Sequence, residues 1–276
     1  MQNDASHFSS THTPDLPPLL AELGITLAIT TYQAGKVIFV SSDGDGLQHL
    51  PRTFDTPMGM AVKDNQMALA LKDRIVLLAN EPRLAASYPN KPNYYDALWV
   101  PRMVSYCGEL NAHDMAWGED GLVGVNTLFS CLFRLDEQHS FVPIWQPPFI
   151  NTLVSEDRCH LNGLALAPGE KGRAVVSALG ATNEREGWRD NKMEGGVLMS
   201  VPEGEEVLTG LPMPHSPRWI GDELYLLLSA RGELAVVDLD EDVFRWTMEV
   251  KVTGTFLCSR SVARVLISQG QGGKIV

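Results

Sequence analysis

The stretch NAHDMAWGEDGLVGVNTLFSCLFRLD (111–136) decides the fold, because a short phrase leads through a polar turn into two apolar segments. Related phrases recur along the chain: TPMGMAV (56–62), NAHDMAW (111–117), HLNGLAL (160–166) and PHSPRWI (214–220). Aligned on Gly59, Asp114, Gly163 and Pro217, they are separated by 55, 49 and 54 residues. A period of roughly 40–55 residues with several strands in each unit is typical of β-propeller blades.

The segments between these phrases have the character of strands. Five pairs of apolar, β-branched segments predict hairpins: 25–32 with 36–42, 66–71 with 74–80, 121–127 with 130–136, 173–180 with 195–202, and 223–229 with 233–240. The connections are short and polar except in the fourth pair, where residues 181–194 intervene. Helix is expected only at 16–23 and near 92–99. A β-sandwich would not explain the recurring phrase. We therefore predict an all-β fold, a β-propeller of four-stranded antiparallel blades, of the six-bladed type.

Composition and charge limit the partners. A chain of 276 residues with 44% hydrophobic residues can bury a sizeable core, and we expect a polar arm over 1–18 before a single propeller domain over 19–276. The formal net charge of −12 disfavours nucleic acid and anionic membranes, which are bound by clustered Lys and Arg. No secretory signal is expected, and the four widely spaced cysteines indicate reduced thiols. A cytoplasmic protein is expected.

The start of each phrase supplies the candidate site. The residues before the aligned column are Met58, His113, Asn162 and Ser216, and innermost strands of a propeller begin near its axis. Polar residues repeated at this point converge on one axial pocket. The candidate ligand-binding residues are His113, Asn126, His160, Asn162, His215 and Arg218.

Each candidate also has a structural interpretation. Asn162-Gly163 is a strong turn signal, and a lone histidine is more often structural than functional. Arg218 suits a carboxylate or phosphate, but an ion pair between blades is equally compatible with it. His113 and Asp114 are adjacent on a strand and so point to opposite faces. We expect His113 to face inward and Asp114 to bind backbone amides of a neighbouring blade.

Two resemblances follow from these motifs. HLNGLA (160–165) resembles the Asn-Gly-Leu phrase of the gluconolactonase and senescence-marker-protein propellers, which implies Asn162 as a ligand for a divalent ion (Ca²⁺, Mg²⁺, Mn²⁺ or Zn²⁺). Over nearly the whole chain, TYQAGK (31–36), PMGMAV (57–62), AHDMAW (112–117), HLNGLA and MPHSPRW (213–219) are similar to a bacterial family of conserved hypothetical, propeller-like proteins. That family implies a further blade, so the sequence over 254–276 predicts a ring that is incomplete at the C-terminus.

Three functions remain open at this point. The convergence of His, Asn and Arg without a recognisable catalytic set favours a propeller that binds a small polar or anionic ligand. A metal-dependent, lactonase-like hydrolase and a protein-docking scaffold are the alternatives, since fold alone does not choose among them. The sequence has no Gly-rich phosphate loop, no H-E-x-x-H and no G-x-S-x-G motif. These residues assign no reaction.

Overall fold

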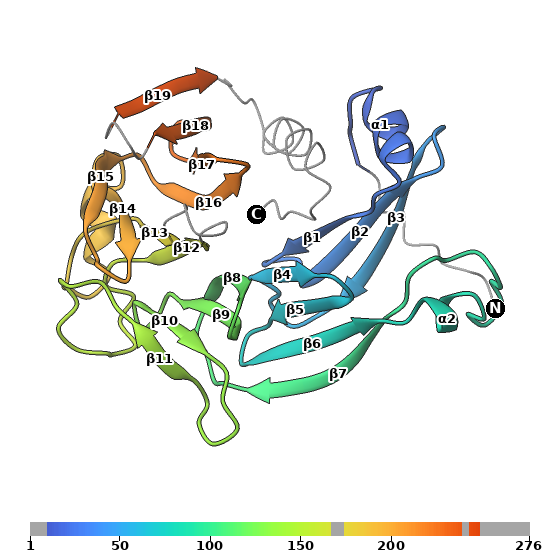
Figure 1. Cartoon of the computed structure of the whole chain (residues 1–276), viewed down its shortest axis with the longest axis horizontal. Helices are drawn as coiled ribbons and strands as arrows, with labels where there is room; N and C mark the ends of the chain where they lie inside the picture. Colours follow the sequence, from blue (N-terminus) through green and yellow to red (C-terminus); the bar gives the residue numbers. More distant parts are fainter. Residues whose placement is uncertain (1–9, 167–173, 239–242, 249–276) are drawn as a thin grey trace.

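The computed structural model describes residues 10–166, 174–238 and 243–248. These residues form five antiparallel sheets around a common centre, so the chain is a β-propeller (Figure 1). Four of the sheets have four strands and the first has three. The predicted all-β propeller is confirmed, but six blades are not supported, since the five predicted hairpins account for all five sheets. The sixth blade rested on the family resemblance alone, and residues 254–276 lie outside the described residues.

The five sheets follow each other along the chain. Blade 1 consists of β1 (Leu27–Thr31), β2 (Lys36–Ser42) and β3 (Leu47–Thr53). Blade 2 consists of β4 (Met60–Lys63), β5 (Gln66–Ala70), β6 (Arg74–Asn80) and β7 (Trp99–Tyr106). Blade 3 consists of β8 (Ala112–Gly118), β9 (Gly121–Asn126), β10 (Cys131–Arg134) and β11 (Val142–Trp145). Blade 4 consists of β12 (Leu161–Ala165), β13 (Ala174–Ala178), β14 (Gly196–Val201) and β15 (Glu206–Leu211). Blade 5 consists of β16 (Pro214–Ile220), β17 (Glu223–Leu228), β18 (Glu233–Asp238) and β19 (Val243–Met248).

The four recurring phrases form the first strands of blades 2 to 5. β4, β8, β12 and β16 are edge strands of their sheets, and they contact one another in sequence order nearest the centre (Figure 1). This contact is close enough to require glycine. A Cβ on Gly59 would lie 2.6 Å from the carbonyl oxygen of Ala112, and one on Gly163 would lie 2.4 Å from Cδ of Pro217.

The core lies between the blades, because both faces of a blade are covered. Successive residues of β14 illustrate it: Val197 and Met199 pack into the cluster shared with blade 3, while Leu198 packs into the cluster shared with blade 5. Side chains alternate between the two faces of a strand, so a strand that is buried on both faces becomes a continuous apolar run. This explains why the hairpins were visible in the sequence as unbroken apolar segments.

Helices contribute little. α1 (Leu16–Leu23) has the predicted bounds and buries Leu16 and Leu20 against β2, so residues 16–18 of the expected polar arm belong to a packed helix. The helix expected near 92–99 is absent; a four-residue helix, α2 (Pro82–Ala85), lies earlier in the same connection. A 3₁₀-helix, η1 (Gly187–Asn191), lies in the connection between β13 and β14. No helix in the described part of the chain is long and apolar enough to cross a membrane.

Candidate functional site

The inner strands begin with a repeated backbone conformation. Thr56, Asn111, His160 and Met213 have φ angles of 53°, 48°, 51° and 51°, in the left-handed region. Successive members of this set are 55, 49 and 53 positions apart. The alignment on sequence gave 55, 49 and 54, so in the structure the fourth phrase is aligned one residue earlier than the sequence indicated. The residue two positions later is Met58, His113, Asn162 or His215. The histidine of blade 5, rather than Ser216, therefore occupies the repeated position.

His113 and His215 are held in the same way. Nδ1 of each donates to the carbonyl oxygen two residues earlier, at 2.8 Å for Asn111 and 2.9 Å for Met213. A hydroxyl group from the residue that follows the second strand of the same blade also lies beside each Nδ1, from Thr127 at 2.8 Å and from Ser229 at 3.1 Å. Because a carbonyl oxygen only accepts, the proton is on Nδ1 in both rings, and Nε2 carries the lone pair.

His160 is anchored by a carboxylate instead. Its Nδ1 lies 2.9 Å from both carboxylate oxygens of Asp157, whose Oδ2 also accepts from Nε1 of Trp188 at 3.2 Å. The indole ring of Trp188 packs on the imidazole with 4.4 Å between ring centroids. Nε2 of His160 makes no hydrogen bond with the described residues. The buried polar side-chain atoms that lack a partner among these residues do not include it, so Nε2 is accessible to solvent. The same holds for Nε2 of His215.

The three histidines form one cluster. The rings of His113 and His160 meet edge to face, with centroids 4.8 Å apart. Burial lowers the pKa of His113 to about 4, and the neighbouring His160 and His215 contribute to this lowering. Burial is also the main cause of the lowered pKa of His215. His113 and His215 are thus neutral imidazoles near neutral pH, and the sequence-predicted convergence of these two with His160 is observed.

Asn162 is buried and makes hydrogen bonds with both ends of its amide group. Oδ1 accepts from Oγ of Ser177 at 2.6 Å, and Nδ2 donates to the carbonyl oxygen of Pro214 at 3.0 Å. The side chain therefore ties β12 to β13 and to the next blade. In the described part of the chain no group of three His, Cys, Asp or Glu residues could hold a metal ion. These residues do not fit the divalent ion that the gluconolactonase resemblance implies.

Arg218 spans the blades. Its Nη1 and Nη2 donate to Oδ2 and Oδ1 of Asp114 at 2.8 and 3.0 Å, and Nη1 also donates to the carbonyl oxygen of Leu164 at 3.1 Å. Oδ2 of Asp114 accepts from the backbone amide of Leu164 at 3.1 Å, as expected for a residue that binds a neighbouring blade. The guanidinium is thus engaged in an inter-blade ion pair, and its predicted role in ligand binding stays a prediction.

Asn126 lies at the end of β9, in the turn to β10. Its Oδ1 accepts from the backbone amide of Phe129 at 3.1 Å, and its Nδ2 is buried without a partner among the described residues. This contact is that of a turn residue. Its predicted role in ligand binding stays a prediction.

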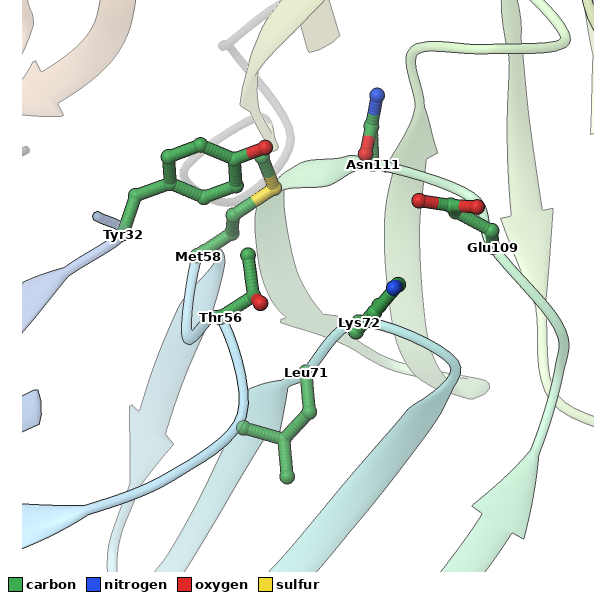
Figure 2. Close-up of a pocket in the computed structure, with 7 residues that line it drawn as sticks. All are labelled: Tyr32, Thr56, Met58, Leu71, Lys72, Glu109 and Asn111. Carbon is green, nitrogen blue, oxygen red and sulfur yellow. The ribbon is translucent and has the colours of Figure 1, made fainter. Parts of the chain in front are cut away.

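A pocket of about 170 Å³ lies beside the cluster, at the start of the inner strands of blades 2 and 3 (Figure 2). None of the six predicted residues lines it. Its walls are formed by residues from the first three blades: Tyr32, Thr56, Met58, Leu71, Lys72, Glu109 and Asn111. Met58 occupies the repeated position that is His113 in blade 3, and Asn111 also accepts the hydrogen bond of His113. The axial end therefore contains a histidine cluster and a separate pocket.

Comparison with known proteins places this arrangement in a family. The family model "Domain of unknown function (DUF4915)" matches residues 14–256. The chain belongs to the DUF4915 family. No curated protein matches the sequence. The resemblance to gluconolactonases is not confirmed by these comparisons.

Solved structures similar to this DUF4915 chain are propellers of low sequence identity. The crystal structure of a putative oxidoreductase (glucose dehydrogenase) from Thermus thermophilus is 14% identical, with a TM-score of 0.51, over 83% of this chain and 82% of that chain. The PQQ-bound aldose sugar dehydrogenase from Streptomyces coelicolor is also 14% identical, over 78% and 74%, with a TM-score of 0.45. Apo AztD from Citrobacter koseri is 13% identical, with a TM-score of 0.37, over 83% of this chain and 60% of that chain. The first of these supports the fold.

Sequence reasoning missed two residues of the DUF4915 site. Asp157 precedes His160 by three positions, and this spacing was a local signal that could have been read. Trp188 reaches His160 from the connection between β13 and β14, outside every recurring phrase. This connection is much longer than the turns between the second and third strands of blades 2, 3 and 5. Its length was the one feature of the sequence that pointed to Trp188.

Proposed function

We propose that this DUF4915 propeller binds a small, neutral ligand that carries hydroxyl groups, at the histidine cluster of its axial end. The observation that carries this proposal is the Asp157–His160 pair. The carboxylate fixes the imidazole with Nδ1 protonated, so that the solvent-reached Nε2 can only accept a hydrogen bond while the ring is neutral. His215 offers a second Nε2 acceptor under the same rule.

The charge of the site favours a neutral ligand over an anion. The cation that suggested an anionic ligand, Arg218, is paired with Asp114. Burial lowers the pKa of both His113 and His215, so neither supplies a positive charge near neutral pH. A ligand with hydroxyl donors satisfies imidazole acceptors without requiring a counter-charge. An anion would be desolvated here without a positive charge from Arg218, His113 or His215 to compensate it.

Binding to a panel of neutral monosaccharides and polyols tests the proposal, with small carboxylates and divalent metal salts as further arms. Sugars are the first probes because they are rich in hydroxyl donors, and one fold neighbour is described as a putative glucose dehydrogenase. Isothermal titration calorimetry should show binding by a neutral probe, and His160→Ala should weaken it by about 10-fold, since an interaction of roughly 1.4 kcal/mol is lost.

The chain offers a matched control for that variant. His139 forms the same three-residue pair with Asp136, at 2.9 Å, but its side chain is 64% exposed on the connection between β10 and β11. His139→Ala should leave binding unchanged. Binding of carboxylates alone, or equal effects of the two substitutions, would contradict the proposal. Binding that requires a metal salt would favour the hydrolase alternative instead.

A further inference from the structure

The pocket beside the histidine cluster has charges of both signs on its wall. Lys72 follows β5 and Glu109 precedes β8, so the two side chains reach the pocket from different blades (Figure 2). Neither side chain makes a hydrogen bond or ion pair with the described residues. The carboxylate nearest to Lys72 along the chain, Asp73, is already bound by Nε of Arg74 at 2.6 Å and by its Nη2 at 3.0 Å. Among the described residues, the pocket thus presents one unpaired ammonium and one unpaired carboxylate.

The other walls combine polar groups with an apolar surface. The hydroxyl of Tyr32 and the side-chain amide of Asn111 also lack hydrogen bonds to described residues, whereas the hydroxyl of Thr56 donates to Asp55 at 2.9 Å. Met58 forms the apolar part, and Figure 2 shows the Tyr32 ring extending toward it. The side chain of Leu71 points away from these two residues and packs against the core cluster of blade 2. The lining is therefore mainly polar, with a small apolar part among convergent polar groups.

We propose that this pocket binds a small zwitterion with an apolar side group, of the α-amino acid class. Lys72 pairs with the carboxylate of the ligand, Glu109 pairs with its ammonium group, and Met58 contacts the side group. Charge-assisted hydrogen bonds of this kind are stronger than neutral ones, and opposite charges on the two sides fix the orientation of the ligand.

The size of the pocket limits the ligand further. A volume of about 170 Å³ is below the roughly 300–1,000 Å³ of pockets for drug-sized ligands, which favours a ligand of the size of one amino acid. The site shares no side chain with the histidine cluster. The inference therefore stands on a different observation from the proposed function, and each can fail without the other.

Three related probes separate the two charges. L-Valine carries both charges, L-valine methyl ester lacks the carboxylate, and N-acetyl-L-valine lacks the ammonium group. Calorimetric titration of the full chain should detect L-valine and neither derivative. Equal binding of all three, or no binding of L-valine, would overturn the proposal.

Variants then assign the charges to residues. Lys72→Met and Glu109→Gln should each weaken L-valine binding by about 10-fold or more, because each removes one charged hydrogen bond. Lys63→Met and Glu119→Gln, on exposed residues of the same two blades, are the matched controls and should bind as the unmodified chain does. His160→Ala should also leave L-valine binding unchanged, since it belongs to the other site. L-Valine binding that persists in both pocket variants would place the ligand elsewhere and overturn the proposal.

Discussion

The pair formed by Asp114 and Arg218 connects three successive blades, and its removal should destabilise the whole propeller. Asp114 lies in β8 of blade 3 and Arg218 lies in β16 of blade 5, while the backbone of Leu164, in β12 between them, bonds to both. Asp114→Ala removes the acceptors of the two guanidinium bonds at 2.8 and 3.0 Å and of the Leu164 amide at 3.1 Å. It also leaves the Arg218 charge without this carboxylate.

The magnitude follows from burial. The side chains of Arg218 and Asp114 are 20% and 2% exposed, and breaking a buried pair by removing one partner costs about 3–5 kcal/mol. Domains are stable by only about 5–15 kcal/mol, so this is a large fraction of the free energy of unfolding. At about 2–4 °C per kcal/mol for a chain of this size class, the melting temperature should fall by roughly 6–20 °C.

Urea unfolding followed by tryptophan fluorescence, together with thermal melting, measures this cost. The control is Asp73→Ala, which breaks the pair with Arg74; that contact is short, 2.6 Å, but the side chains are 28% and 43% exposed. An exposed pair contributes less than about 1 kcal/mol. In a double variant, Arg218→Met should recover part of the loss by removing the unpaired charge. If Asp114→Ala costs no more than Asp73→Ala, the pair does not hold the blades together and the reasoning is refuted.

Two further predictions concern the same inner strands. The pKa of His113 is about 4 in the folded chain against 6.5 for an ordinary histidine, so the unfolded chain binds the proton more readily between these pH values. The free energy of unfolding should be at its full value above about pH 6.5 and fall by roughly 3 kcal/mol toward pH 4. Urea titrations at several pH values in this range should show that the free energy of unfolding depends less steeply on pH in His113→Gln. If the free energy of unfolding depends on pH equally in the unmodified chain and in His113→Gln, the loss of stability does not come from His113. Gly163→Ala places a Cβ 2.4 Å from Cδ of Pro217 and should cost about 1–3 kcal/mol in thermal unfolding, whereas Gly46→Ala, with nothing within 4 Å, should be close to neutral.

The fold was predictable because its signals are local. Each hairpin is a contiguous pair of apolar segments, and the registers of β5 with β6 and of β17 with β18 confirm two of them directly. The recurring phrase marks the first strand of each of blades 2 to 5, so its period measures the repeat. The number of blades was not predictable in this way, because the sixth was taken from relatives and not from a phrase in this chain.

The site was predictable only in part, because its chemistry depends on contacts between blades. The convergence of His113, His160 and His215 followed from their places in successive repeats. Whether Arg218 would bind a ligand or an ion-pair partner depended on a residue 104 positions away in sequence, and no local pattern decides that. Lys72 and Glu109 were missed for the same reason, since neither lies in a recurring phrase and the pocket exists only where three blades meet.

The one-residue displacement in the fourth phrase has a structural cause. The register between the first and second strands shifts inside the phrase in β8, β12 and β16, so an irregularity in each inner strand breaks strict alternation. Similarity of letters then aligned Pro217 with Gly163 and Ser216 with Asn162. The hydroxyl groups that contact the two histidines give the correct alignment of the fourth phrase, because Thr127 follows His113 by 14 residues and Ser229 follows His215 by the same number. In a propeller with bulged inner strands, a repeated pair of interacting residues is therefore a better guide to the axial position than the phrase itself.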